Sequence, residues 1–181
     1  MVALLRLTTR NVAGLIGGNG SRRFEAGMVE FSVTPDTPNT ADVRALLLRH
    51  LELMRASSPE ESCHVMEPEA LFDRGVVMFA ARDPSGLLGV GALAQIDGAH
   101  GELKSMHTTA HARGRGVGRA ILAALLESAR NQGMTRVSLE TGAAPLFAPA
   151  RALYAAQGFT VCPPFGAYVA DPLSVFMTRT L

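Results

Sequence analysis

The amino-acid sequence predicts one α/β (α+β) domain, built on a mixed, mostly antiparallel central sheet flanked by helices. The first observation is length, because 181 residues correspond to a single domain of ordinary size. The second is a meander of apolar runs joined by turn sequences, which predicts antiparallel strands. The third is a glycine-rich segment that joins a strand to a long amphipathic helix, followed by strand, helix and strand.

Residues 1–27 differ in composition from the rest of the chain. They carry four arginines against a single acidic residue, Glu25, and their apolar runs show no sustained period. We therefore expect a poorly structured N-terminal extension over 1–27 and the folded domain over 28–181. An arginine-rich, acid-poor leader is also typical of a transit peptide, and that alternative stays open.

The first helix of the domain is predicted to begin at Asn39 or Thr40, because apolar residues recur at helical spacing through Met54. His50 falls on the apolar stripe of this helix. A hydrogen-bonded structural histidine and a histidine that lines a pocket are both compatible with that position. The following connection, 57–69, is acidic and would favour a cationic amine if it covers a site.

The meander comes next. Apolar runs over 76–81 and 87–96 flank an Asp-Pro-Ser-Gly turn sequence and predict an antiparallel hairpin. Gly89 and Gly91 in the second run indicate a bulge. A further glycine-containing turn leads to a third strand over 102–108.

The glycine-rich segment 113–119 precedes a helix that ends at Gly133, and a strand over 135–141 leads to a helix closed by Gly158. Glycines directly before a helix let backbone N–H groups approach an anion, and the helix dipole adds partial positive charge. Flanking arginines strengthen that field. A phosphate-bearing ligand and an ordinary tight turn are both compatible with this spacing.

The residues after the last glycine decide between known phosphate-binding motifs. A Walker A loop needs Lys followed by Ser or Thr, whereas Gly118 is followed by Arg119 and Ala120. A dinucleotide fingerprint needs a third glycine where the chain has Ile121, although Glu140 ends the next strand about where a ribose-binding acid would lie. The first motif is excluded and the second stays open.

Composition argues against several other classes. A net charge of +1 disfavours a dedicated nucleic-acid binder. No apolar run approaches the roughly 18 residues of a membrane span, so no membrane partner is expected. Cys63 and Cys162, the only cysteines, show neither metal-ligand spacing nor a disulfide framework, so we expect no metal and a cytoplasmic location.

Two motifs resemble the GNAT superfamily of acetyl-CoA-dependent N-acetyltransferases. Its signature is Arg or Gln, two residues, Gly, one residue, and Gly or Ala, which Arg113, Gly116 and Gly118 match. Residues 153–159, Leu-Tyr-Ala-Ala-Gln-Gly-Phe, look like the family's Leu-Tyr-x-x-x-Gly-Phe segment, in which the tyrosine lies close to the coenzyme sulfur.

The resemblance covers 28–181 at the level of element order. The segment 162–177 is similar to that of a subgroup of small bacterial members of unclear substrate. One departure is Phe147, which stands where the family usually has an asparagine that contacts pantetheine.

The resemblance implies acetyl-CoA as co-substrate and assigns a role to each motif. Backbone N–H groups of Met106, His107 and Thr108 would hold the thioester and the pantetheine. Tyr154 would protonate the leaving thiolate. The pyrophosphate would lie on the backbone and side chains of the glycine-rich loop, that is Arg113, Gly114, Arg115, Gly116, Val117, Gly118 and Arg119.

The attacking amine also needs a base. Glu102 is the first candidate, because it begins the strand that would carry the thioester and shares a face with Lys104 and Met106 by strand alternation. An ion pair between Glu102 and Lys104 is the structural alternative. Glu140 on the neighbouring strand is the reserve candidate.

These observations predict acetyl transfer from acetyl-CoA to a small-molecule primary amine by direct attack. The alternative is a non-catalytic module that senses an acyl-CoA or a dinucleotide. The amine and the oligomeric state, a homodimer included, stay open.

Overall fold

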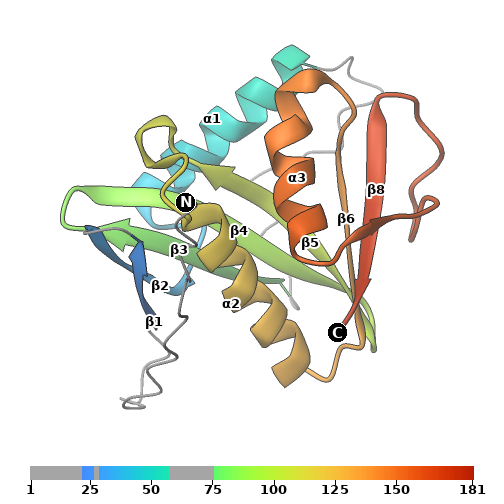
Figure 1. Cartoon of the computed structure of the whole chain (residues 1–181), viewed down its shortest axis with the longest axis horizontal. Helices are drawn as coiled ribbons and strands as arrows, with labels where there is room; N and C mark the ends of the chain where they lie inside the picture. The colour runs from blue at the N-terminus through green and yellow to red at the C-terminus, as the bar shows by residue number, and fades with distance from the viewer. Residues whose placement is uncertain (1–21, 27–28, 58–75) are drawn as a thin grey trace, which may run out of the picture.

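The computed structural model describes residues 22–26, 29–57 and 76–181, which form an eight-stranded sheet packed against helices (Figure 1). The strand order is β1-β2-β3-β4-β5-β6-β8-β7. Neighbouring strands pair antiparallel except β5 and β6, which are parallel. The predicted fold class, a mixed and mostly antiparallel sheet flanked by helices, is confirmed.

The strands are β1 (Arg22–Ala26), β2 (Val29–Asp36), β3 (Val76–Asp83), β4 (Gly86–Asp97), β5 (His100–Thr108), β6 (Arg136–Gly142), β7 (Thr160–Val161) and β8 (Ser174–Thr180). The helices are α1 (Ala41–Ser57), α2 (Val117–Asn131) and α3 (Ala148–Ala156), with short 3-10 turns η3 (Ala110–Ala112) and η4 (Pro145–Phe147). None of the helices among the described residues is long and apolar enough to cross a membrane.

The helices bury two different sets of core residues. Apolar residues of α2 and α3 share one large cluster with alternate residues of β4, β5 and β6. Three residues of α1, Val43, Leu46 and Leu47, instead pack with residues of β3 and β4 that point the other way, among them Val90 and Ala92. Figure 1 shows α2 and α3 together in front of the sheet. α1 therefore covers the opposite face.

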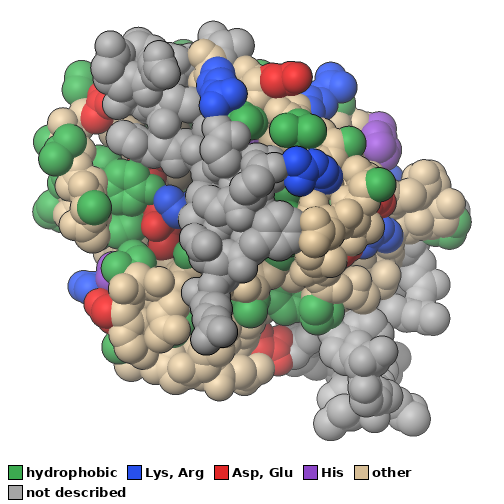
Figure 2. Space-filling view, turned by 180° about the vertical axis from the view of Figure 1, so that it is seen from behind, with side chains coloured by type: hydrophobic (Ala, Val, Ile, Leu, Met, Phe, Trp, Pro, Cys, Tyr) green, Lys and Arg blue, Asp and Glu red, His purple; other side chains and the backbone are tan. Residues whose placement is uncertain are grey.

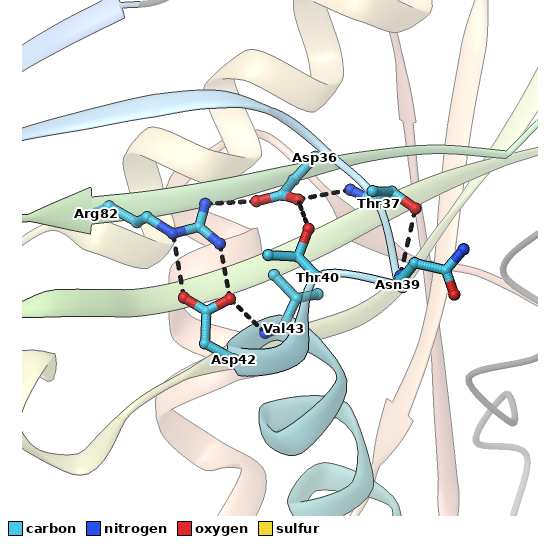
Figure 3. A network of polar contacts seen from close by, with 7 residues as sticks. All are labelled: Asp36, Thr37, Asn39, Thr40, Asp42, Val43 and Arg82. Atoms are coloured by element: carbon cyan, nitrogen blue, oxygen red, sulfur yellow. Dashed lines mark hydrogen bonds and ion pairs between the residues drawn. The ribbon is translucent and has the colours of Figure 1, made fainter.

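A polar network fixes the start of α1 against the sheet (Figure 3). Arg82 of β3 contacts Asp36 at the end of β2, and its Nη2 lies 3.0 Å from Oδ1 of Asp42 in the first turn of α1. The hydroxyl of Thr40 donates to Asp36 at 2.6 Å. Because two strands hold its first turn, α1 has a defined direction across the sheet, and this brings His50 to β5.

The bulge predicted beside Gly89 is confirmed: Gly89 pairs with Ala81 and Leu87 with Arg82, so Leu88 is an extra residue of β4. A second bulge, which the sequence did not predict, lies on β5. Gly91 of β4 faces two residues of β5, Ser105 and Met106, and Ser105 has a left-handed backbone with φ of 52°. A Cβ at Gly91 would lie 2.4 Å from Sδ of Met106 and 2.8 Å from Cγ2 of Ile121. The glycine at position 91 is therefore explained by the close packing of β5 and α2 against it.

Most of the predicted extension lies outside the described residues. Within it, Arg22–Ala26 forms β1, which pairs antiparallel with β2. The division of the chain at residue 28 stays a prediction. The acidic connection 57–69 also lies outside the described residues, except for Ser57 at the end of α1.

Charged side chains are mixed by sign on the surface. Figure 2 shows the molecule from behind, and on the part formed by described residues several basic side chains lie beside acidic ones. This distribution agrees with the net charge of +1 and gives that face no overall field of one sign.

Candidate active site

The parallel strands β5 and β6 pair only as far as Leu103 and Leu139. β5 then continues to Thr108 and β6 to Gly142, and the two strand ends border a cavity of about 620 Å³. Residues of α1, the glycine-rich loop and α3 complete its wall. The volume lies within the range of about 300 to 1,000 Å³ typical of small-molecule sites.

Ten of the twelve predicted site residues line this cavity. They are Glu102, Met106, His107, Thr108, Arg113, Gly114, Gly116, Gly118, Arg119 and Tyr154. The other two, Arg115 and Val117, turn their side chains elsewhere: Arg115 contacts Asp83, and Val117 is 1% exposed in the core. In this arrangement, these two residues offer a ligand only their backbone groups.

The glycine-rich loop presents backbone donors to the cavity. Gly114 and Gly116 have φ of 77° and 81°, a left-handed conformation that other residues rarely adopt. Gly116 is the N-cap of α2, and no side chain caps the first turn of this helix. Its first N–H groups are therefore available to an anion, beside the guanidinium groups of Arg113 and Arg119.

An ion pair ties this loop to the β3–β4 turn. Nη2 of Arg115 lies 2.7 Å from Oδ2 of Asp83, whose side chain is only 5% exposed. Hydrogen bonds from Ser85 and from Arg115 lower the pKa of Asp83 to about 2. The pair thus stays charged at neutral pH and holds the loop in place.

Tyr154 reaches the cavity from α3, on the face that α2 covers. The residue is 6% exposed, and its ring packs edge-on against Phe159 with centroids 5.9 Å apart. Burial raises the pKa of Tyr154 well above its usual value, and the charge of Glu140 adds to this effect. The hydroxyl therefore keeps its hydrogen at neutral pH and can donate it.

Glu102 has two partners. Its Oε1 lies 2.8 Å from Nζ of Lys104, and it accepts a hydrogen bond of 2.6 Å from the hydroxyl of Tyr168. Lys104 in turn donates to the Tyr168 oxygen at 2.7 Å. We call Glu102, Lys104 and Tyr168 the polar triangle.

Met106, predicted on the same face as Glu102, packs beside α2 instead, because the bulge at Ser105 shifts strand alternation by one residue.

Tyr168 is the site residue that sequence reasoning left without a role. The only signal was its place within the segment similar to that of a bacterial subgroup. Burial, followed by the charge of Glu102, raises the pKa of Tyr168 above its usual value. The phenol is therefore protonated, and because the Lys104 ammonium can only donate, the one phenol hydrogen goes to Glu102.

His50 both lines the cavity and is hydrogen-bonded, so the two alternatives for this residue hold together. Its Nδ1 lies 3.1 Å from Nδ1 of His107, and the ring centroids are 5.0 Å apart. Burial and then His107 lower the pKa of His50 to about 4. Burial, Arg113 and Arg49 lower the pKa of His107. At neutral pH the pair is uncharged, with one Nδ1 protonated and the other accepting.

This pair predicts an acid-sensitive fold. The pKa of His50 falls from 6.5 to about 4 on folding, so between these values the unfolded chain binds more protons than the folded one. We expect the unfolding free energy to decrease as the pH is lowered from about 6.5 to about 4, with up to about 3 kcal/mol attributable to this group. Urea denaturation across this pH range measures it. His50→Gln should flatten the dependence, and an unchanged slope would contradict the assignment.

The β6 side of the cavity carries Glu140 and ends in an aromatic contact. Glu140 lines the cavity and accepts a hydrogen bond of 2.7 Å from the hydroxyl of Ser174. The ring of Phe147 packs on Gly142 so closely that a Cβ there would lie 2.2 Å from Cδ2 of the ring. The position where the resemblance expects an asparagine therefore offers an apolar surface.

Among the described residues, no three or more His, Cys, Asp or Glu side chains are arranged to hold a metal ion. The groups that face the cavity are suited to binding an anion at the loop and to moving protons at the tyrosine and the carboxylates.

Comparisons with known proteins agree with this geometry. Residues 41–159 match the model of the family described as Acetyltransferase (GNAT) family. The chain is 42% identical over 139 residues to the uncharacterized N-acetyltransferase YsnE of Bacillus subtilis (strain 168), covering 77% of this chain and 92% of YsnE. It is 37% identical over 151 residues to the uncharacterized N-acetyltransferase YedL of Escherichia coli (strain K12), covering 83% of this chain and 95% of YedL.

A solved structure extends the similarity to the fold. It is the crystal structure of a proposed acyl-CoA N-acyltransferase from Klebsiella pneumoniae subsp. pneumoniae, with a TM-score of 0.68 and 30% sequence identity. The match covers 83% of this chain and 97% of that one.

Proposed function

Because the chain belongs to the acetyltransferase (GNAT) family, we propose that it transfers the acetyl group of acetyl-CoA to the primary amine of a small molecule by direct attack. The observation that carries this proposal is the cavity between the parted strands, with uncapped helix N–H groups at the loop and titratable groups deeper in its wall. Relatives named as N-acetyltransferases favour an enzyme over the sensor module.

Each part of the co-substrate has a matching part of the cavity. The pyrophosphate suits the first turn of α2 between Arg113 and Arg119, where backbone donors and positive charge coincide. The pantetheine and thioester suit the end of β5 at Met106 to Thr108, which still pairs with β4 but no longer with β6, so backbone N–H and C=O groups on its β6 edge can contact them. The ring of Phe147 supplies an apolar contact nearby.

The reaction requires two proton transfers. The amine nitrogen attacks the thioester carbon, the carbon–sulfur bond breaks, and Tyr154 gives its proton to the departing sulfur. The proton of the amine passes to Glu102, directly or through water, with Glu140 as the reserve acceptor. Tyr154 comes from the α3 face, whereas Glu102 lies on the α1 face together with Lys104. Acid and base thus approach the reacting atoms from opposite faces.

The first experiment compares ligands and then tests turnover. Calorimetry should detect acetyl-CoA binding and no comparable binding of NAD. A thiol-release assay with acetyl-CoA and a panel of amines, amino acids and polyamines should identify the acceptors. Binding of NAD without acetyl-CoA would contradict the proposal, and acetyl-CoA binding without thiol release from any acceptor would favour the sensor module.

The base assignment predicts a difference between two carboxylates. Glu102→Gln should lower kcat by on the order of 10²-fold or more, and raising the pH should restore part of the rate because free amine then needs no enzymatic base. Glu140→Gln, an isosteric change in the same cavity, is the control and should chiefly raise KM for the amine. Steady-state kinetics as a function of pH separates the two. If Glu140→Gln shows the pH-rescued defect and Glu102→Gln does not, the base is Glu140.

The cytoplasmic location and the oligomeric state, a homodimer included, stay predictions.

A further inference from the structure

Lys104 and Glu140 occupy equivalent positions on the two parted strands. Each follows the last parallel pair, Leu103 and Leu139, and each lines the cavity. Both leucines belong to the cluster under α2, so strand alternation puts Lys104 and Glu140 on the opposite face. Lys104 pairs across the strands with Ala92, which packs under α1, so the side chain of Lys104 lies on the α1 face of the sheet. A cation and an anion therefore border the same end of the cavity.

The described residues accept only some of the N–H donors of the Lys104 ammonium. An ammonium has three N–H donors, and the described residues take two of them: Oε1 of Glu102 at 2.8 Å and the hydroxyl oxygen of Tyr168 at 2.7 Å. Tyr168 does not neutralise the ammonium, because the phenol keeps its hydrogen and donates it to Glu102. Since Lys104 lines the cavity, its third donor is available to what the cavity holds.

This donor discriminates between classes of amine. A bound acceptor displaces water from Lys104, and an amine without an acceptor group would leave the third N–H unpaired, which is costly for a desolvated cation. A carboxylate beside the amine would instead form a charge-assisted hydrogen bond. The ammonium of the same molecule would face the Glu140 carboxylate on β6. We propose, on the basis of the proposed function, that the acceptor is a zwitterion of the α-amino acid class, selected by Lys104 and Glu140.

The remainder of the wall suits the side chain of such a molecule. Leu53 and Met54 of α1 contribute apolar surface, and the adjoining His50–His107 pair is uncharged at neutral pH. By the proposed function, the cavity of about 620 Å³ must also hold the pyrophosphate, the pantetheine and the thioester of the coenzyme, which restricts the acceptor to a small molecule.

The test compares acceptors that differ only in the carboxylate. Thiol release is measured with L-amino acids, with their α-carboxamides and with the decarboxylated amines, at pH values that give equal fractions of free amine. The wild-type enzyme should favour the acids in kcat/KM by on the order of 10²-fold. Lys104→Met should reduce this preference to less than about fivefold, whereas Lys104→Arg should retain part of it.

The preference is a ratio measured in one preparation, so partial unfolding of a variant leaves it unchanged. Arg113→Gln is the matched control: it also removes one positive charge from the cavity wall, and it should weaken acetyl-CoA binding without changing the preference. Equal turnover of acids and carboxamides by the wild type, or an unchanged preference in Lys104→Met, would overturn the inference and leave the proposed function standing.

Absence of thiol release from every acceptor would contradict the proposed function instead. Calorimetry with glutamate, serine and leucine added to the enzyme in the presence of free CoA then decides the inference by itself. Binding that is lost in Lys104→Met supports it, and absence of binding to the wild type overturns it.

Discussion

Gly116→Glu is expected to abolish acetyl-CoA binding, with a loss of affinity of about 10³-fold or more. Gly116 caps the N-terminus of α2 with φ of 81°, where a side chain is strained and where the helix dipole and the arginines draw an anion. A glutamate there puts its carboxylate in the place of the pyrophosphate and repels it. Calorimetry with acetyl-CoA measures the loss.

Gly116→Gln separates charge from backbone strain. Glutamine has the same shape as glutamate and imposes the same left-handed conformation, so it should cost similar stability but substantially less affinity. Thermal unfolding of both variants checks that they remain folded to the same extent. Normal acetyl-CoA binding by Gly116→Glu would show that the pyrophosphate lies elsewhere. Equal losses in the two variants would show that strain, not charge, determines the effect.

Tyr154→Phe is expected to lower kcat by on the order of 10- to 10⁴-fold while acetyl-CoA affinity stays nearly unchanged. The ring is buried against Phe159, and phenylalanine keeps that packing. Only the hydroxyl is lost, and it acts on the thiolate that forms in the transition state. Single-turnover kinetics and calorimetry measure the two quantities separately.

The chain contains only two tyrosines, which makes Tyr168→Phe a matched control. Its hydroxyl bonds Glu102 and Lys104, so its removal should change the pH profile and KM for the amine. A thioester whose thiol is more acidic releases its thiolate without needing a proton. Such a substrate should restore the kcat of Tyr154→Phe and not that of Tyr168→Phe. Full activity of Tyr154→Phe would contradict the acid assignment.

Much of the fold was predictable because its signals are local. The first helix, the hairpin and the strand that follows it were predicted from apolar spacing and turn residues, and the structure confirms them. The glycine-rich loop was predictable for the same reason, since Gly114 and Gly116 report backbone conformation directly. Such features depend on the residues of one segment and its hydrogen bonds.

The second bulge, on β5, shows where local signals fail. The glycines of β4 correctly indicated the bulge at Leu88, beside Gly89, but nothing in the sequence indicated the extra residue of β5 at Ser105. Strand alternation then assigned Met106 to the wrong face. A glycine in a strand indicates that a neighbouring element packs closely against it, and only the tertiary structure shows which element that is.

By itself the sequence determined the order of elements, the glycine-rich loop before α2 and the residue types available for proton transfer. The tertiary structure decided which of them meet. His50 and His107 are 57 positions apart, and Tyr168 and Glu102 are 66 apart. Periodicity shows that a residue faces the core or the solvent, but pairing register, helix direction and the parting of β5 from β6 decide which side chain lies opposite. These are properties of packed elements, so no single segment encodes them.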